Sequence, residues 1–252
     1  MGVSRFANRV AVITGAANGI GAATAHRFAD EGAAVVLADI DDDRGTALAK
    51  EIDAGGGHAS FVHVDVGSAD DWARLRDHVG KLHGRLDVLH SNAARVVVGA
   101  AHELSQTDWD DQLRVAVTAA WLGARTFIDQ LRDARGSIVL TSSVHALVGM
   151  PRHPAYAAAK GALTALGRQL AVEYGPDVRV NTVLPGPILT GMWDRVNDDE
   201  RRASAAATVA KRLGRPQEVA AVVAFLASDD ASYMTGASVV VDGGWSIVKD
   251  SA

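Results

Sequence analysis

Two side chains with complementary proton chemistry lie four residues apart in the stretch Y-A-A-A-K, at Tyr156 and Lys160. The surrounding residues, Ala155–Glu173, are predicted to form a helix, and this spacing places both side chains on one helix face. Tyrosine titrates near pH ~10, too high to exchange protons readily at neutral pH, but a nearby cation favours the phenolate. The pair therefore predicts a general acid–base group, although a solvated helix face can show the same spacing.

A glycine-rich stretch, T-G-A-A-N-G-I-G, follows the first predicted strand and opens a predicted helix at Thr14–Gly21. Gly15 permits a tight turn, Gly19 lets the backbone approach a diphosphate, and Gly21 allows close packing of helix on strand. The free N–H groups and the positive dipole end of the helix attract phosphate. In this position the stretch predicts a dinucleotide-binding site.

An acidic residue, Asp39, ends the second predicted strand, 18 residues beyond Gly21. Its carboxylate can accept hydrogen bonds from both hydroxyls of an adenosine ribose and would repel a 2′-phosphate, which favours NAD over NADP. Asn18 points the same way, because a cation at that position would help to bind the phosphate. The alternative is a turn or capping aspartate within A-D-I-D-D-D.

The composition excludes several classes of function. The chain has 252 residues, 48% of them hydrophobic and 22% charged, and its net charge of −5 gives no electrostatic basis for binding nucleic acid or an anionic membrane. It has no cysteine, and its nine histidines show no ligand spacing, so no metal site is expected. Without an apolar run of ~20 residues or a signal-peptide pattern, the cytoplasm is the expected compartment.

Short apolar runs alternate with longer helical stretches along the whole chain. The predicted strands are Val10–Thr14, Ala34–Ala38, Ser60–Val64, Leu86–Ser91, Ser137–Ser142, Val178–Val183 and Ser238–Val241. The predicted helices include Gly21–Glu31, Ser68–His83, Thr107–Arg132, Ala155–Glu173 and Pro216–Ser228. Continuously apolar strands are typical of parallel sheets covered on both faces. This α/β pattern predicts one Rossmann-type, doubly wound parallel sheet of about seven strands with helices on both faces, as a single domain over residues 1–252.

One segment interrupts this alternation, from Pro185 to about Lys211. It contains P-G-P, an acidic N-D-D-E and an alanine-rich amphipathic piece. Long insertions in compact domains are often lids over a site, and a mobile surface excursion is the open alternative.

With the glycine loop, Asp39 and Y-A-A-A-K in one chain, the sequence resembles the short-chain dehydrogenases/reductases over essentially all of its length. Further family motifs occur in the expected order: D-V at Asp65–Val66, S-N-A-A at Ser91–Ala94, T-S-S-V at Thr141–Val144, P-G-P-I-L-T at Pro185–Thr190, R-L-G-R-P-Q-E-V-A, and Y-M-T-G-A-S-V-V-V-D-G-G.

The resemblance implies an NAD-dependent oxidoreductase that interconverts a small-molecule secondary alcohol and a ketone by hydride transfer. Tyr156 would be the general acid–base, Ser143 would hydrogen-bond the developing oxyanion, and Lys160 would hold the nicotinamide ribose. Family members are usually homotetramers, paired through Thr107–Arg132, Ala155–Glu173 and the C-terminal segment. The implied cofactor-binding residues are Gly15, Asn18, Gly19, Ile20, Gly21, Asp39, Asp65, Val66, Asn92, Tyr156, Lys160, Ile188 and Thr190.

The sequence departs from the family pattern in two places, one of them S-N-A-A for N-N-A-G, where Ser91 can still make a sheet-bridging hydrogen bond. The family often has a further catalytic asparagine seven residues after a tryptophan, but counting from Trp109 leads to Ala116, which cannot hydrogen-bond a relay water. Thr118, the nearest polar residue, is expected to point to nearly the opposite side. Ala94 replaces a glycine, which is tolerable unless the backbone there needs a positive φ angle.

Two alternative functions remain open at this stage. A 3-oxoacyl carrier-protein reductase would usually use NADPH, against which Asp39 argues. A weakly catalytic NAD-binding sensor or scaffold is suggested by Ala116. The substrate pocket is expected to be formed by loops near the site, with four side chains that could face the substrate: Val96, His145, His153 and Trp193.

Overall fold

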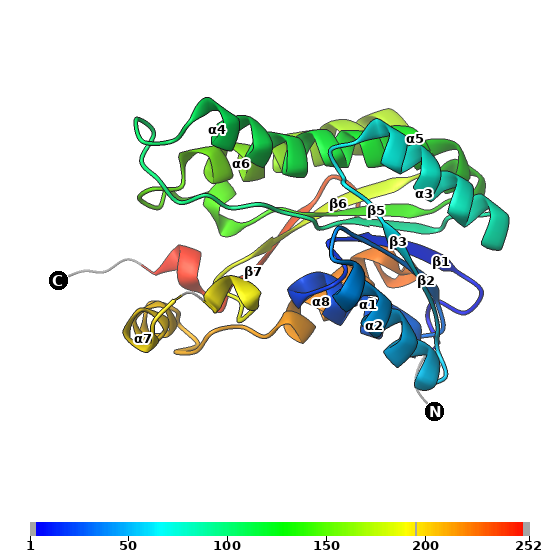
Figure 1. Cartoon of the computed structure of the whole chain (residues 1–252), viewed down its shortest axis with the longest axis horizontal. Helices are drawn as coiled ribbons and strands as arrows, with labels where there is room; N and C mark the ends of the chain where they lie inside the picture. The colour runs from blue at the N-terminus through cyan, green and yellow to red at the C-terminus, as the bar shows by residue number, and fades with distance from the viewer. Residues whose placement is uncertain (1–3, 195, 249–252) are drawn as a thin grey trace.

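The sheet predicted from the sequence is present in the computed structural model, which describes residues 4–194 and 196–248. Seven strands form one parallel sheet in the order β3-β2-β1-β4-β5-β6-β7. They are β1 (Val10–Thr14), β2 (Ala34–Asp39), β3 (His58–His63), β4 (Val88–Ser91), β5 (Ser137–Thr141), β6 (Arg179–Pro185) and β7 (Ser238–Val241). The single Rossmann-type domain is thereby confirmed (Figure 1).

Helices cover both faces of the sheet. One layer contains α3 (Ala69–Leu82), α4 (Gln106–Leu113), the π-helix η1 (Arg114–Thr118), α5 (Ala119–Ala134) and α6 (Pro154–Tyr174). The other contains α1 (Gly19–Asp30), α2 (Asp42–Ala54) and α8 (Pro216–Ala227), as Figure 1 shows. Because successive strand residues face opposite sides, Val12 joins one apolar core and its neighbour Ile13 the other.

Local sequence signals set several helix starts. Asn18 caps α1 by accepting a hydrogen bond from the Gly19 amide, and Ser68 caps α3 through the amide of Asp71. Pro216 occupies the first turn of α8, where its missing N–H would have no partner within the helix. These caps fix where the helices begin relative to the strand ends.

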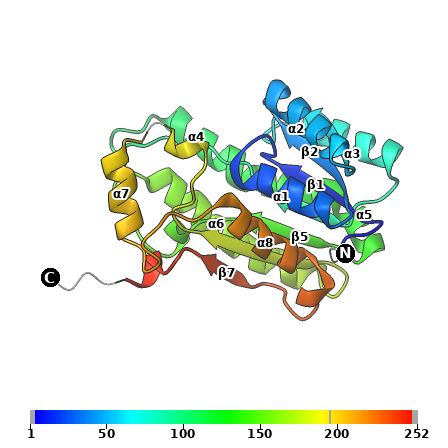
Figure 2. The same ribbon diagram turned by 90° about the horizontal axis from the view of Figure 1, so that it is seen from below.

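Two regions differ from the sequence prediction. The single helix predicted over Thr107–Arg132 is divided into α4, η1 and α5, and its middle turn is a π-helix. The segment after β6 contains a 3-10 turn, η3 (Gly191–Trp193), and a helix, α7 (Asp198–Ala206), capped by Asn197. Figure 2 shows α7 outside the two helical layers, near the C-terminal end of the chain.

The strand order reverses between β1 and β4, which are neighbours although far apart in the sequence. In open α/β sheets, ligands bind beyond the carboxyl ends of the strands at such a reversal. The loops after β1 and β4 therefore meet where a dinucleotide is expected. Within residues 4–194 and 196–248, no helix combines the length and apolar character needed to cross a membrane.

Candidate active site

The glycine loop after β1 has a conformation that side chains would prevent. Gly15 and Gly19 have φ angles of 62° and 56°, in the left-handed region that glycine adopts without strain. A Cβ atom at Gly21 would lie 2.0 Å from the carbonyl oxygen of Gly15, so α1 can approach the loop only with glycine there. Close backbone approach at the start of a helix leaves room and N–H donors for a diphosphate.

Asn92, in the loop after β4, holds this glycine loop in place. Its Nδ2 atom donates to the carbonyl oxygens of Thr14 and Gly15, both at 3.1 Å, while its amide donates to Oγ1 of Thr14 at 2.9 Å. This side chain, which the resemblance implies to be cofactor-binding, is therefore engaged in holding the loop. Ala94 does not have a positive φ angle, so the alanine is accommodated.

Asp39 lies at the end of β2, as predicted, and its carboxylate makes the turn contacts of the alternative interpretation. One carboxylate oxygen accepts from the amide of Ala17 in the glycine loop at 2.9 Å, and the other accepts from the amide of Asp41 at 3.1 Å. A carboxylate has about four acceptor sites. Its turn contacts therefore leave capacity for the two ribose hydroxyls.

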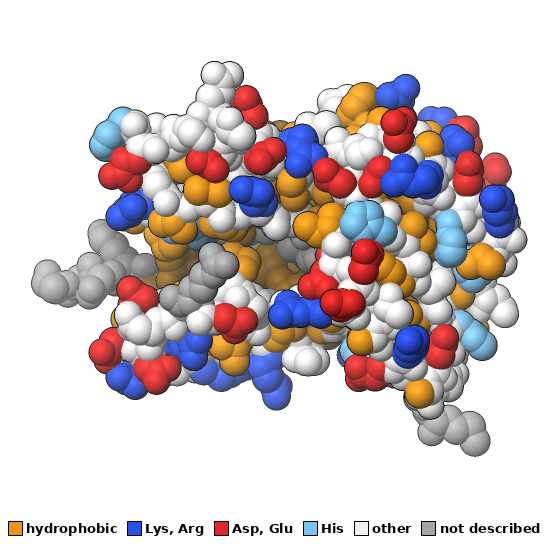
Figure 3. Space-filling view, in the orientation of Figure 1, with side chains coloured by type: hydrophobic (Ala, Val, Ile, Leu, Met, Phe, Trp, Pro, Cys, Tyr) orange, Lys and Arg blue, Asp and Glu red, His pale blue; other side chains and the backbone are white. Residues whose placement is uncertain are grey.

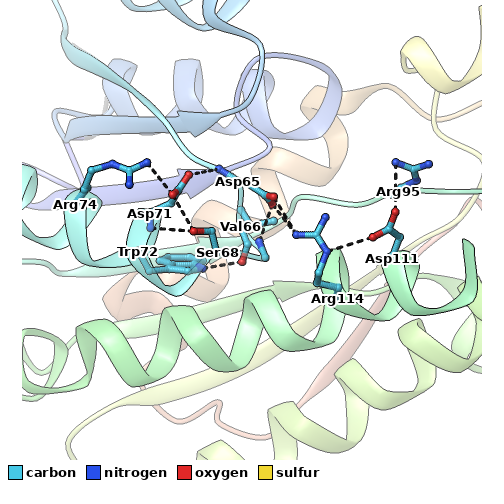
Figure 4. Close-up of polar contacts among 10 residues, drawn as sticks. Asp65, Val66, Ser68, Asp71, Trp72, Arg74, Arg95, Asp111 and Arg114 are labelled. Atoms are coloured by element: carbon cyan, nitrogen blue, oxygen red, sulfur yellow. Dashed lines mark hydrogen bonds and ion pairs between the residues drawn. The ribbon is translucent and has the colours of Figure 1, made fainter. Parts of the chain in front are cut away.

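Asp65 and Val66 lie in the loop after β3, on the same side of the crevice. Figure 4 shows the carboxylate of Asp65 paired with Nη1 of Arg114 at 3.0 Å, while Arg114 also contacts Asp111. Val66 is buried, and its carbonyl oxygen accepts from the indole of Trp72 at 2.8 Å. The cofactor contact that the resemblance implies for Asp65 must therefore share this carboxylate with an arginine that the sequence did not single out.

The residues after β6 close over the glycine loop. A methyl group at Gly19 would stand 3.1 Å from Cγ2 of Thr190, so these two residues are in near contact. Ile188 is buried and pairs with Gly214, whereas Ile20 is half-buried at the start of α1. A cavity of about 490 Å³ lies beside this contact, lined by residues of the glycine loop, of α1, of the segment after β6 and of the start of α8.

The three predicted catalytic side chains come together from two elements. Ser143 follows β5, while Tyr156 and Lys160 lie on α6, and Nζ of Lys160 is 5.4 Å from the centre of the Tyr156 ring. Oγ of Ser143 accepts from the amide of His145 at 3.2 Å. Ser142 faces away, donating to the carbonyl oxygen of Lys160 at 2.6 Å. The arrangement places a hydroxyl, a phenol and an ammonium on one wall of the crevice.

Lys160 is only 1% exposed, an unusual environment for an ammonium group. Its Nζ donates to the carbonyl oxygen of Thr141 at 2.8 Å. Burial disfavours the charged form and lowers the pKa of Lys160 to about 8. An ammonium has three donors, so two more hydrogen bonds can be made to a ligand.

The pKa of Tyr156 is raised, whereas its spacing from Lys160 predicted a lowered value. Burial raises the pKa of its phenol, and a hydrogen bond with Ser143 offsets part of that rise. The Lys160 ammonium is directed to the carbonyl oxygen of Thr141, so the protein groups by themselves do not produce the lowered pKa that the spacing predicted.

Ala116 occupies the middle of the π-helix η1 and is buried, while Thr118 is exposed. The prediction that Thr118 points away is confirmed. The π-turn therefore forms without an asparagine side chain at its centre. Such single π-turns in longer helices are frequent at functional sites.

Two histidine rings lie next to Tyr156, and one of them is stacked on a tryptophan. The ring of His145 meets Tyr156 edge to face at 5.2 Å, and His153 lies 6.4 Å from Tyr156. Trp245, from the 3-10 turn η5 (Trp245–Ile247), lies parallel to His145. Sequence reasoning named both histidines but missed Trp245, because only tertiary structure brings it next to His145, 100 positions earlier in the chain.

The residues present fit a nicotinamide dinucleotide. The closed glycine loop, the open N-terminus of α1 and the acceptor at Asp39 supply the three elements that such a ligand requires. Among the residues that the structure describes, no group of three or more metal-binding side chains is brought together.

Comparison with known proteins identifies the class. The sequence profile described as "Enoyl-(Acyl carrier protein) reductase" matches residues 15–246. The crystal structure of gox2181 superposes with a TM-score of 0.93 at 31% identity, covering 97% of this chain and 99% of that one. The chain belongs to the short-chain dehydrogenase/reductase family.

Curated relatives narrow the activity. The cyclopentanol dehydrogenase of Comamonas testosteroni is 36% identical over 247 residues, covering 96% of this chain and 99% of the relative. The meso-2,3-butanediol dehydrogenase of Serratia marcescens is 40% identical over 241 residues, covering 95% of each. The protein is accordingly an alcohol dehydrogenase of this family, whose members use nicotinamide cofactors, and the sensor or scaffold alternative is disfavoured.

Proposed function

We propose that this protein is an NAD-dependent dehydrogenase that interconverts a small secondary alcohol and its ketone, with Tyr156 as the general acid–base. The observation that carries the proposal is the grouping of Ser143, Tyr156 and Lys160 beside a loop shaped for a dinucleotide. The relatives support the reaction class, since they are named for a cyclic alcohol and for a diol.

When bound, the nicotinamide ring supplies the hydride acceptor, and positioning it against the carbinol carbon provides much of the rate. Tyr156 takes the hydroxyl proton of the alcohol during oxidation and returns it during reduction. The hydroxyl of Ser143 accepts from the amide of His145 and donates to the carbonyl oxygen of Pro185 over a long 3.5 Å, so it can turn to donate to the substrate oxygen as negative charge develops. Loss of such a donor commonly lowers the rate by ~10²–10³.

Lys160 has two roles in this scheme. Its remaining N–H groups hold the ribose next to the nicotinamide, and its charge stabilises the phenolate of Tyr156 as the proton leaves. Ala116 removes the asparagine side chain of the family relay, so proton exchange with solvent does not use that amide here.

We further propose that NAD is preferred to NADP. The two oxygens of Asp39 retain acceptor capacity for the ribose hydroxyls, and their negative charge opposes a 2′-phosphate. Asn18 supports the same preference, because its side chain caps α1 and brings no positive charge to this position.

The direct test follows NADH formation over a panel of cyclic and aromatic secondary alcohols, with Tyr156→Phe as the comparison. We expect the substitution to lower kcat by ~10²–10⁴ because the proton acceptor is lost, while the affinity for NADH stays within a few-fold. Undiminished turnover in Tyr156→Phe would overturn the assigned mechanism.

The family expectation of a homotetramer is also proposed for this chain. Large apolar side chains are exposed on the predicted pairing surfaces, including Trp121 on α5 (46%), Val172 on α6 (82%) and Val240 on β7 (41%). Burial of such side chains between subunits would be favourable. Light scattering should give four times the 26.3 kDa chain mass, and a monomer across the micromolar range would contradict the proposal.

A further inference from the structure

Four rings form one wall of the substrate side of the crevice. His145 lies on the 3-10 turn η2 (Val144–Ala146), which directly follows Ser143. Its ring meets those of Tyr156 and His153 edge to face, both with centres 5.2 Å away, and lies parallel to Trp245 at 6.3 Å. His145 is thus the central ring, in contact with the phenol that handles the proton.

The turn bearing Trp245 is firmly anchored. One oxygen of Asp242 accepts from the amide of Gly244 at 2.8 Å, and the other accepts from the amide and hydroxyl of Ser246 at 2.7 and 2.6 Å. Asp242 itself packs against Gly186 at the end of β6, leaving no room there for a Cβ atom. The wall is therefore built by fixed elements on both sides of His145.

The imidazole of His145 has hydrogen-bonding capacity that the protein does not use. Its Nδ1 atom is buried and has no hydrogen-bond partner among the residues that the structure describes. Burial, followed by the charges of His153 and Lys160, lowers the pKa of His145 to about 4. The ring is therefore neutral near pH 7, with one donor and one acceptor.

His153 provides an internal contrast. Its Nδ1 atom already lies 2.8 Å from the carbonyl oxygen of Pro151, so one of its two polar atoms is engaged by the backbone. Buried polar groups in proteins are nearly always hydrogen-bonded, and an orphaned one beside a reactive side chain calls for a ligand. Only His145 meets that condition in this wall.

The surroundings of the wall are apolar. Leu147 and Met150, which follow η2, are 58% and 39% exposed, and Met192 on η3 is 61% exposed. Figure 3 shows the molecule deeply hollowed between the α4–α6 side and the α7 side, with largely hydrophobic walls. In a hollow of this kind, one unused polar group has a large influence on which ligands are accepted.

We propose that His145 determines specificity by hydrogen-bonding a second oxygen of the substrate, so that the enzyme favours vicinal diols and their α-hydroxyketones. The inference rests on the proposed function, because Tyr156 and Ser143 engage the first oxygen, at the carbon that is oxidised. With its ring packed against that of Tyr156, His145 is placed to meet an oxygen on the adjacent carbon. The apolar remainder of the hollow takes the hydrocarbon part.

A site that hydrogen-bonds a substrate hydroxyl discriminates against the analogue lacking it, because the protein group is then left unpaired. The measurement is therefore a ratio, kcat/KM for 1,2-cyclohexanediol divided by kcat/KM for cyclohexanol, with both cis and trans diols tested. We expect a ratio of about ten or more for at least one diol isomer of the unmodified enzyme.

Two matched variants assign that ratio to the imidazole. His145→Phe keeps a ring in the wall but removes both nitrogens, and should lower the ratio about tenfold, mainly through a higher KM for the diol. His153→Phe makes the same change one ring further out and should leave the ratio within about twofold. His145→Gln, which restores a donor and an acceptor, should recover part of the preference.

The outcomes separate this inference from the function on which it rests. Equal ratios in the unmodified enzyme and in His145→Phe would overturn it, as would an unmodified enzyme that does not prefer either diol to cyclohexanol. The second result needs no variant, so misfolding of His145→Phe does not protect the proposal. In both cases the proposed function survives if Tyr156→Phe abolishes oxidation of cyclohexanol; if it does not, both fall.

Discussion

Polar groups on the nucleotide side of the crevice are hydrogen-bonded within the protein, whereas those on the substrate side are buried with fewer partners. On the nucleotide side, Thr14, Asp39 and Asn92 are each hydrogen-bonded within the protein and hold the glycine loop. On the substrate side, Lys160 is buried with a depressed pKa, and His145 has a buried nitrogen without a partner. Large apolar side chains are also exposed there.

This difference indicates that the two sides of the crevice bind their ligands differently. A loop fixed by internal hydrogen bonds is ready for its ligand and loses little entropy on binding. On the other side, the burial of Lys160 is only partly compensated by its hydrogen bond to Thr141 and destabilises the fold, and strongly perturbed groups in a cleft are typical of functional sites. The nucleotide side is shaped for one ligand, while the substrate side holds capacity that a substrate completes.

The largest effect should come from relieving the buried charge on the substrate side. Burial lowers the pKa of Lys160 from 10.5 to about 8, so between these pH values the unfolded chain binds more protons than the folded one. The free energy of unfolding should therefore rise by ~3 kcal/mol from pH 8 to pH 10.5 relative to Lys160→Met, which lacks the titration. Urea unfolding of both proteins at the two pH values measures the difference.

Lys50→Met, at an exposed position on α2, is the control for this experiment. If the free energy of unfolding varies with pH in the same way in the unmodified protein and in Lys160→Met, burial does not lower the pKa of Lys160. The contrast between the two sides of the crevice would then fail at its strongest point.

The second-largest effect should come from a substitution that disrupts the preformed glycine loop on the nucleotide side. In Gly21→Ala the new methyl group would lie 2.0 Å from the carbonyl oxygen of Gly15, so helix and loop must separate. Overpacking of this kind costs ~1–3 kcal/mol, and we expect the affinity for NADH to fall by up to about 100-fold. Fluorescence titration with NADH measures it.

Gly80→Ala provides the matched control, because a Cβ atom at Gly80 on α3 meets nothing within 4 Å. Alanine there should keep the affinity and raise helix stability slightly, by ~0.5–1 kcal/mol. If Gly21→Ala binds NADH as tightly as Gly80→Ala, the loop is more adaptable than its geometry suggests.

A smaller effect is expected at Asp39, the residue proposed to bind the cofactor ribose. Asp39→Ser removes the negative charge, and the ratio of kcat/KM with NAD to that with NADP should fall by about tenfold or somewhat more. Asp43→Ser, exposed in the first turn of α2, should leave the ratio unchanged. A preference for NADP in the unmodified enzyme would contradict the proposal and return attention to a 3-oxoacyl carrier-protein reductase.

Much of the fold could be predicted because its signals are local. Val10–Thr14 and Ser238–Val241 were predicted to the residue, and Ser68 caps α3 as its sequence suggests. Boundaries elsewhere shifted by one or two residues, where burial rather than propensity decides the end of an element. The π-turn at Arg114–Thr118 was not foreseen, because a helical sequence pattern does not distinguish an inserted turn.

The site residues can also be separated into those predicted from local sequence and those that depend on distant segments. The spacing of Tyr156 and Lys160 on one helix face follows from helical geometry. In contrast, the pairing of Asp65 with Arg114 joins residues 49 positions apart, and no sequence pattern indicated it. The direction in which the pKa of Tyr156 shifts also escaped prediction, because desolvation depends on everything packed around the ring.

The sequence by itself determined the elements, the glycine loop and the order of the family motifs, since each depends on residues a few positions apart. Tertiary structure alone decided that Lys160 is buried, that Asn92 holds the loop, and that Trp245 stands beside His145. The physical reason is distance along the chain. Burial, charge and ring contacts arise between segments that meet only when the sheet has formed.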